Sequence, residues 1–319
     1  MALAFITALG ACDSGKRNEG GQESEQSTTT TIAEGIPPTG RFLAVAGEQS
    51  LDAGLYEIRF APLRLERLSD ASRVGAISAC ATEVVVAAAQ QEVGFSDTLQ
   101  TLRSGKLVPF EGLADAKGSS PALTSDCRMA YKAVDRSDPA LIDRLHLWDP
   151  GSGTDTVVYS SSELLGLDHG PNGQVSVIEG NRGEPGQPVA ATGIVIISAG
   201  GLRSIPAPAP DLGVLRWGAS SWMAIGRNEA KSTLFLDPQT RAKSELAGWR
   251  PLAWSPDGSE LLVADSAEYR TLGIVQATDL SAVRTLGRVE VGVYGAAWLP
   301  AGATPEQGGL GGVSLRAGR

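Results

Sequence analysis

Histidine, cysteine and aromatic residues are scarce in this sequence, and recognisable catalytic motifs are missing from it. The chain has 2 His and 3 Cys, and aromatic residues make up 5% of it. Because a metal site usually takes about three or four His, Cys or carboxylate ligands, His146 and His169 cannot form a histidine-rich site between them. No serine stands in a Gly-x-Ser-x-Gly elbow, and neither a phosphate-binding loop nor a dinucleotide-binding fingerprint occurs. The sequence therefore predicts no metal and no cofactor, and it identifies no catalytic residue.

Long apolar runs and clusters of positive charge are absent as well. No apolar run approaches the roughly 20 residues that a membrane-spanning helix needs. The net charge is −9, and Lys and Arg are scattered, whereas binding of nucleic acid requires concentrated basic residues. We therefore expect no nucleic-acid partner. What the chain does contain is 42% hydrophobic residues together with 39 Gly and 18 Pro, which indicates a turn-rich chain that can bury a core.

A short pattern of strand, tight turn and strand recurs along the chain. Its clearest copy is PLAWSPDGSELLVAD, residues 251–265, in which a tryptophan precedes a Ser-Pro-Asp-Gly turn. Asp, Pro and Gly favour tight reversals, and the flanking apolar residues are typical of β-strands. The copies recur about every 40 residues, which is the spacing of blades in β-propellers. The related segments are residues 75–89, 120–133, 167–180, 215–227 and 295–304.

Two further strands are predicted after each copy of this pattern. Helical repeats of similar length would need apolar residues about every 3.6 positions, and we find no long amphipathic helix. Four short strands in each repeat predict an all-β protein, a six-bladed β-propeller of four-stranded antiparallel blades. The third strands are predicted at 55–58, 98–102, 145–148, 194–197, 234–236 and 272–276, and the fourth strands at 64–68, 107–110, 156–159, 202–205, 243–246 and 282–286.

The two ends of the repeat region complete one blade. The first repeat has no first strand before Phe42, and the last repeat, which contains Trp298, has a first strand with nothing after it. Pairing of these two segments would close the ring and would remove open sheet edges. We therefore expect a propeller over residues 41–303, with one blade assembled from the N-terminal and C-terminal segments.

The motif of a tryptophan followed by Ser-Pro-Asp-Gly resembles the repeats of the WD-repeat-like β-propellers in the TolB family and in bacterial surface proteins. The resemblance is carried by residues 252–264, with weaker copies at 167–180 and 295–304. It implies a propeller fold. Because propellers serve binding, scaffolding and catalysis alike, it implies no particular activity.

Residues 1–12 resemble a bacterial lipoprotein signal peptide. MALAFITALGAC is apolar, and Leu9-Gly10-Ala11-Cys12 resembles the lipobox, in which the cysteine becomes lipidated. Acyl chains such as palmitate on Cys12 would anchor the protein by burying methylene groups, at about 0.8 kcal/mol each. No Lys or Arg precedes the short apolar run, which predicts a start codon upstream of Met1. The alternative is a cytosolic protein that begins with an apolar strand.

Polar sequence of low complexity follows Cys12. Residues 13–40 have almost no large apolar side chains, so burial cannot offset the entropy of ordering them, and we expect a flexible tether. Residues 304–319 are expected to form a flexible tail. A tether directly after a lipidated cysteine favours a protein of the cell envelope, anchored on the extracytoplasmic side of a bacterial membrane.

Cys80 and Cys127 occupy equivalent turns, between the first and second strands of successive repeats. Equivalent positions on neighbouring blades can lie near one another, and outside the cytoplasm two such cysteines can form a disulfide. The bridge would join the second and third blades and would contribute about 2–4 kcal/mol. The alternative is two separate buried thiols.

Two long connections are candidates for a binding face. Residues 133–144 and 179–193 both join the second and third strands of their repeats, so we expect them on the same face of the propeller. Long loops on one face of a rigid scaffold are common binding sites. An arginine beside an aromatic residue at the rim of that face also suits recognition. The predicted residues of this binding face are Asp135, Arg136, Arg182, Glu184, Trp249 and Arg250.

Two functions remain open at this point. The first is a lipid-anchored, monomeric envelope scaffold that binds a protein partner or another ligand without catalysis; an anchored sensor domain is not distinguished from it. The second is a propeller enzyme, a hydrolase or lyase that acts on envelope glycans or small molecules at the mouth of the central channel. An enzyme would gather carboxylates, histidines or a metal there. The scarcity of histidine and the absence of a nucleophile motif favour the scaffold.

Overall fold

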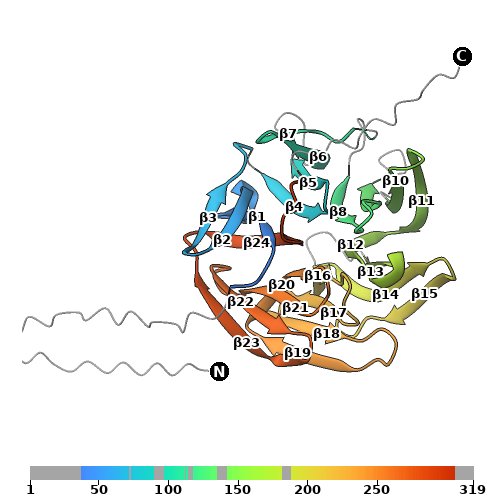
Figure 1. Ribbon diagram of the computed structural model, residues 1–319. Coiled ribbons are helices and arrows are strands. Elements are labelled where there is room, and N and C mark those ends of the chain that lie inside the picture. The colour runs from blue at the N-terminus through green and yellow to red at the C-terminus, as the bar shows by residue number, and fades with distance from the viewer. Residues whose placement is uncertain are drawn as a thin grey trace, which may run out of the picture. The chain divides into compact units, whose positions relative to one another are not determined.

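Six four-stranded antiparallel sheets form a ring in the computed structural model of the chain (Figure 1). The structure describes residues 37–71, 73–89, 97–111, 113, 118–134, 142–181 and 188–305. Among these residues the helical segments are two 3-10 turns, η1 (Ser50–Asp52) and η2 (Pro171–Gly173). Within the same segments, no helix has the length and apolar character needed to cross a membrane. The predicted six-bladed β-propeller is confirmed.

Each blade runs from an inner strand beside the centre of the ring to an outer strand at its edge. Blade 1 contains β24 (Gly292–Leu299), β1 (Arg41–Gly47), β2 (Gly54–Phe60) and β3 (Leu63–Arg67). Blade 2 contains β4 (Val74–Ala79), β5 (Val84–Ala89), β6 (Asp97–Arg103) and β7 (Lys106–Pro109), and blade 3 contains β8 (Ser119–Leu123), β9 (Met129–Val134), β10 (Asp143–Asp149) and β11 (Thr154–Ser161). Blade 4 contains β12 (Glu163–His169), β13 (Val175–Asn181), β14 (Ala190–Ser198) and β15 (Gly201–Pro206), and blade 5 contains β16 (Leu212–Arg216), β17 (Met223–Arg227), β18 (Ser232–Leu236) and β19 (Lys243–Ala247). Blade 6 contains β20 (Trp249–Trp254), β21 (Glu260–Asp265), β22 (Thr271–Gln276) and β23 (Asp279–Arg288).

The ring is closed by strands from opposite ends of the chain. β24, red in Figure 1, lies beside β1, which is blue, and the two strands pair antiparallel with Phe42 opposite Trp298. The ring centroids of these two side chains are 4.3 Å apart. Trp298 Nε1 also donates a hydrogen bond of 2.9 Å to the carbonyl oxygen of Thr39. The prediction that the two chain ends complete one blade is confirmed.

The core consists of apolar layers between neighbouring blades. Because side chains alternate along a β-strand, Phe42 and Ala44 of β1 pack toward blade 6, whereas Leu43 and Val45 pack toward blade 2. Both faces of an inner strand are therefore buried, and such strands read as continuous apolar runs. Four of the six layers contain a buried tryptophan, namely Trp148, Trp217, Trp254 and Trp298.

Because the strands of a blade are antiparallel, the turns between first and second strands lie on one face of the ring. The connections between second and third strands lie on the opposite face. We call the end with the turns between first and second strands the turn face, and the end with the connections between second and third strands the loop face. In blade 6, for example, Trp254 at the end of β20 lies at the turn face, and Trp249 at its start lies at the loop face, where it pairs with Asp265. A ligand can therefore approach two chemically different ends of the same scaffold.

Candidate functional site

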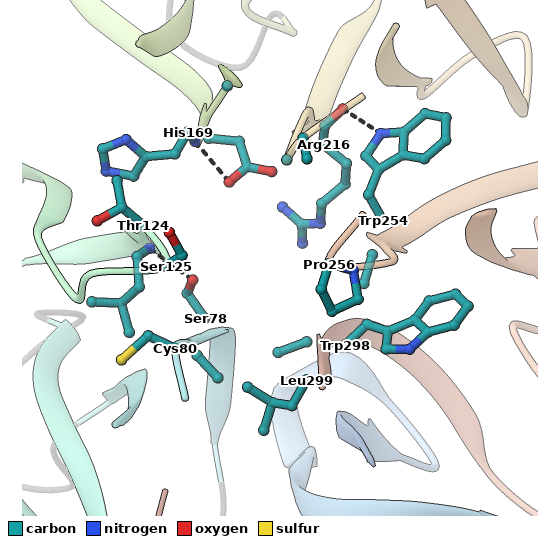
Figure 2. A pocket seen from close by; sticks show the side chains of 18 of the residues that line it. Ser78, Cys80, Thr124, Ser125, His169, Arg216, Trp254, Pro256, Trp298 and Leu299 are labelled. Carbon is teal, nitrogen blue, oxygen red and sulfur yellow. Dashed lines mark hydrogen bonds between the residues drawn. The ribbon is translucent and has the colours of Figure 1, made fainter. Parts of the chain in front are cut away.

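A cavity of about 560 Å³ lies at the turn face, where the six inner strands end (Figure 2). Its volume is in the range of small-molecule pockets, which run from about 300 to 1,000 Å³. Every blade contributes to the lining because all six inner strands converge on the centre of the ring. The lining includes Leu299 of blade 1, Ser78 of blade 2, Leu123 of blade 3, His169 of blade 4, Arg216 of blade 5 and Trp254 of blade 6.

The Ser-Pro-Asp-Gly turn of blade 6 is held by hydrogen bonds between side chains and backbone. Ser255 Oγ donates to Asp257 Oδ1 at 2.6 Å and accepts the N–H of Glu260 at 3.0 Å. Gly258 adopts φ 72°, and a Cβ at this position would lie 2.4 Å from the backbone nitrogen of Ser220 in blade 5. Only glycine satisfies both conditions. The residues of this turn therefore have structural roles, and they fix one part of the cavity wall against the neighbouring blade.

Tryptophans at the ends of inner strands pack on glycines of the preceding blade. A Cβ at Gly170 would lie 2.2 Å from Cε3 of Trp217, and a Cβ at Gly218 would lie 3.2 Å from Cβ of Trp254. Trp254 Nε1 also donates to the carbonyl oxygen of Arg216 at 3.1 Å. These contacts tie successive turns together, so the wall of the cavity is stiff.

The guanidinium group of Arg216 points into the cavity (Figure 2). Arg216 is the last residue of β16, and its Nε donates to the carbonyl oxygen of Leu252 in blade 6 at 2.6 Å. Its Nη1 donates to the carbonyl oxygen of Leu215 at 2.9 Å. Burial lowers the pKa of Arg216, and the nearby charge of Asp168 opposes that shift. Arginine nevertheless remains charged at neutral pH, so the cavity contains a fixed cation.

Asp168 supplies a negative charge at the equivalent position of blade 4. Its Oδ1 accepts the N–H of His169 at 2.8 Å, and its Oδ2 accepts the N–H of Trp217 at 2.9 Å. Burial raises the pKa of this carboxyl, although Arg216 and the two backbone N–H groups act in the opposite direction. Asp168 therefore links blades 4 and 5 and also balances the charge of Arg216.

His169 is a buried, neutral histidine at the edge of the cavity. Its side chain is 6% exposed, and Nδ1 lies 3.3 Å from the carbonyl oxygen of Gln174, to which the neutral ring donates. Burial, assisted by the charge of Arg128, lowers the pKa of His169 to about 4. No group of three His, Cys, Asp or Glu side chains within the described segments is placed to hold a metal ion.

We expect His169 to make the fold sensitive to acid. The pKa is about 4 in the folded protein and 6.5 for an ordinary histidine, so the unfolded chain binds more protons between these values. The free energy of unfolding should therefore fall as the pH drops from 6.5 to 4, by roughly 3 kcal/mol from this residue. Urea unfolding of the wild type and of His169→Asn, which keeps a donor for Gln174, measures the effect. Parallel pH profiles for the two proteins would contradict it.

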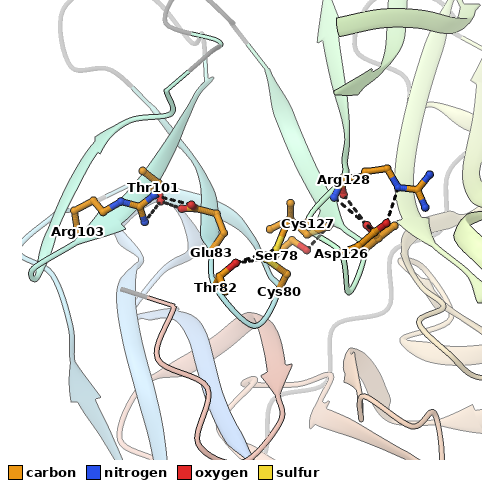
Figure 3. The surroundings of a disulfide bond; sticks show 11 residues. Ser78, Cys80, Thr82, Glu83, Thr101, Arg103, Asp126, Cys127 and Arg128 are labelled. Carbon is orange, nitrogen blue, oxygen red and sulfur yellow. Dashed lines mark hydrogen bonds and ion pairs between the residues drawn. A yellow bond between two sulfur atoms is a disulfide. The ribbon is translucent and has the colours of Figure 1, made fainter. Parts of the chain in front are cut away.

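A disulfide joins Cys80 and Cys127 beside the cavity (Figure 3). Cys80 follows β4 and Cys127 precedes β9, and their Cα atoms are 5.5 Å apart. Both side chains are buried in the layer between blades 2 and 3. Thr82 Oγ1 lies 3.3 Å from the sulfur of Cys127. The bridge therefore fastens two neighbouring first-to-second turns, both of which line the cavity.

Most of the predicted binding-face residues lie outside the described part of the chain. These are Asp135, Arg136, Arg182 and Glu184, and the predicted lipidation site Cys12 also lies outside it. The strand ends that flank them are described. Val134, Asp143, Asn181 and Ala190 all lie at the loop face, at the opposite end of their blades from the cavity.

Trp249 and Arg250 lie at the loop face, but they do not pair with each other. Neighbouring residues of a strand point to opposite sides of the sheet, and Trp249 packs against the apolar layer between blades 5 and 6. The guanidinium carbon of Arg250 lies 5.8 Å from the ring centroid of Tyr269, and Nη1 donates to Asn228 Oδ1 at 2.8 Å. The expected Arg–aromatic contact therefore involves Tyr269 in place of Trp249.

Arg216 and Asp168 are cavity residues that the repeat pattern of the sequence did not predict. Both directly precede the aromatic position of the repeat, which is Trp217 in one blade and His169 in the other. In blade 6 the same position is Ala253, which also lines the cavity. A charged residue at this position of an otherwise apolar inner strand was the signal that could have identified the site.

These features define a six-bladed β-propeller with a small, charged cavity at one end of its central channel. Among solved structures, the chain is similar to TolB from Acinetobacter baumannii, with a TM-score of 0.59 and 15% identity over 83% of this chain and 68% of that chain. It is also similar to the tricorn protease, with a TM-score of 0.52 and 13% identity over 80% of this chain and 30% of that one. No protein-family model and no curated protein sequence matches the chain. At these identities the likeness establishes the TolB-like propeller fold alone.

Proposed function

We propose that this protein is a lipid-anchored, non-catalytic binding protein of the bacterial cell envelope, in which the propeller serves as the scaffold for a protein partner. The closed ring is the observation that carries the proposal. β24 and β1 pair along their length, and apolar layers join all neighbouring blades. A closed ring of this kind is rigid and presents connections at both ends, where binding residues usually lie.

The envelope location is supported by the N-terminal sequence and by the disulfide. Cys12 stands in a lipobox-like segment, and the polar residues 13–40 that follow are suited to a tether. Structural disulfides persist outside the cytoplasm and are rare inside it. The bridge between Cys80 and Cys127 is therefore what an extracytoplasmic location favours.

The loop face has the chemistry of a protein-binding surface. Arg250 stacks on Tyr269, whose ring centroid is 5.2 Å from that of Tyr294. Tyr294 Oη donates to the carbonyl oxygen of Glu48, and the carboxylate of Glu48 pairs with Arg270 at 2.8 Å. Tyrosine and arginine are enriched at protein interfaces. These residues come from blades 1 and 6, so the cluster bridges the blades at which the ring closes.

A propeller enzyme is the second candidate, because a carboxylate and a histidine, Asp168 and His169, both line the cavity. The hydrogen bonds of the lining residues favour the non-catalytic alternative, because they engage these groups in structural contacts. Asp168 accepts two backbone N–H groups, and His169 Nδ1 is engaged by the carbonyl oxygen of Gln174. The Oγ of Ser78 accepts the N–H of Leu123 at 2.9 Å. A catalytic serine needs a base within hydrogen-bond reach, and these contacts give the lining groups structural partners.

Affinity capture from membranes with the intact chain tests the proposal. We expect a specific envelope protein to copurify, and we expect its recovery to fall by roughly tenfold or more when residues 182–187 are replaced by a short Gly-Ser linker. Thermal unfolding should change little, because the replaced segment lies between the ends of β13 and β14. Fractionation of a Cys12→Ser variant checks the anchor, since that variant should leave the membrane fraction.

The matched control is Leu202→Ala, in the same blade but on the outer strand β15, where Leu202 is 55% exposed. This variant should retain the partner. If no protein copurifies and the protein turns over a substrate, the propeller enzyme becomes the better supported of the two candidate functions. A large loss of stability in the linker variant would contradict the binding role of that connection.

A further inference from the structure

We propose that Arg216 binds the carboxylate of a small organic acid that enters the cavity from the turn face. This assigns a small-molecule site at the end of the ring opposite to the loop face. The inference goes beyond the protein partner proposed above and does not depend on it.

The first support is the unused hydrogen-bonding capacity of Arg216. A guanidinium group carries N–H donors on all three of its nitrogens. Nε and Nη1 each donate to a backbone carbonyl oxygen, whereas Nη2 has no hydrogen-bond partner among the described residues. The group points into the cavity (Figure 2). A planar guanidinium with free N–H groups matches the two oxygens of a carboxylate.

The second support is that the position of this guanidinium is fixed. Leu215 and Leu252, whose carbonyl oxygens it contacts, belong to inner strands of two different blades. Nη2 reaches to 3.9 Å from the position that a Cβ would take at Gly295 in β24. The side chain of Arg216 therefore extends from blade 5 across the channel toward blade 1. A binding group that is already held in place costs little entropy when the ligand arrives.

The third support is the arrangement of charges. Asp168 balances the charge of Arg216, but the two side chains form no ion pair in the structure, and both oxygens of Asp168 accept backbone N–H groups. The charge of Asp168 thus lowers the free-energy cost of burying the Arg216 guanidinium, and it leaves the N–H donors of that group available to a ligand. Arg128, which also lines the cavity, pairs with Asp126 at 3.0 Å, and both side chains are more than half exposed. Arg216 is therefore the cation that the cavity offers to an anion.

The walls of the cavity indicate what the rest of the ligand is like. Trp254 and Trp298 line it at the ends of their strands, and their indole rings point away from its centre into the layers between blades (Figure 2). Proline side chains add rigid apolar surface to the cavity lining. These prolines are Pro121, Pro171, Pro256 and Pro300. Apolar surface beside a charged anchor and polar lining residues such as Ser78 and Ser125 suits an acid with a compact aromatic or aliphatic body. The volume of about 560 Å³ admits a small molecule.

Titration of the full chain with matched acids and amides tests the proposal. The probes are benzoate, phenylacetate and hexanoate, each compared with the uncharged amide of the same shape, and the readouts are calorimetry and the fluorescence of the cavity tryptophans. At least one acid should bind about 10- to 100-fold more tightly than its amide, as a charged hydrogen bond predicts. Arg216→Gln should remove that preference. Arg288→Gln, in which an exposed arginine on blade 6 is changed, should keep it.

Two further arms make the result decisive. If Arg216→Gln does not fold, the paired variant Asp168→Asn/Arg216→Gln, which removes both charges, replaces it. Short peptides with a free or an amidated C-terminus identify the source of the carboxylate: tighter binding of the free peptide than of the small acids would assign the site to the end of a protein chain. The proposal is overturned if no acid and no free peptide is preferred over its amide, or if the preference survives the loss of Arg216.

Discussion

A chain that ends after Glu290 is expected to show no cooperative unfolding transition. The truncation removes β24, the inner strand of blade 1, and leaves β1 as an open edge. It also removes Val293, Trp298 and Leu299, which are buried in the layers on either side of that blade. Loss of one buried tryptophan side chain costs about 3–5 kcal/mol, and a whole domain is stable by only about 5–15 kcal/mol. Circular dichroism with denaturant unfolding measures the outcome.

Graded variants separate closure of the ring from a general loss of sequence. A chain that ends at Pro305 retains β24 and should unfold like the full chain. Trp298→Ala should lower the free energy of unfolding by about 3–5 kcal/mol. Trp298→Phe, which loses the hydrogen bond to Thr39 but keeps a ring beside Phe42, should cost less. Leu51→Ala, at a side chain that is 73% exposed, should change little. An unchanged midpoint after removal of β24 would show that the ring does not depend on this strand.

Replacement of Cys80 and Cys127 by serine is expected to lower the free energy of unfolding by about 2–4 kcal/mol. The disulfide closes a loop of 47 residues that spans blades 2 and 3. Removing it restores conformational freedom to the unfolded chain, and it also places two hydroxyl groups in an apolar layer. Guanidinium unfolding of the oxidised wild type and of the double variant measures the difference.

A reductant provides the control within the same experiment. It should destabilise the wild type by a similar amount and should leave the double variant unchanged. Cys12→Ser should behave like the wild type, because Cys12 takes no part in the bridge. If the reductant does not affect the wild type, the two cysteines are separate buried thiols, which is the alternative that the sequence left open.

The architecture was predictable because each blade is encoded by a continuous stretch of chain. The turn around Asp257 and Gly258 is formed by hydrogen bonds between residues at most five positions apart, so its residue types are visible in the sequence. The apolar run of β1 reflects burial on both faces. The first repeat lacks an inner strand and the last repeat lacks the other three, which predicted that the segment containing Trp298 pairs with the segment containing Phe42; the structure adds the register.

The candidate site was much less predictable. The cavity is formed by short pieces of all six blades. The position of the Arg216 guanidinium in it is set by a hydrogen bond to Leu252 in blade 6, and the group lies close to Gly295 in blade 1. Trp249 and Arg250 were expected to act together because they are adjacent, but alternation along β20 separates them, and Tyr269 becomes the partner of Arg250. The outcome at Asp135, Arg136, Arg182 and Glu184 stays a prediction.

The sequence by itself determined the number of blades and the turns within them, because these depend on local turn chemistry and on short apolar runs. It also determined the closure of the ring, because the first and last repeats are each incomplete and complete one another. Only the tertiary structure decided that the cavity lies at the turn face and that Arg216 and Asp168 both line it. The physical reason is that their contacts between blades join residues 36 to 49 positions apart, which come together only when the inner strands converge on one centre.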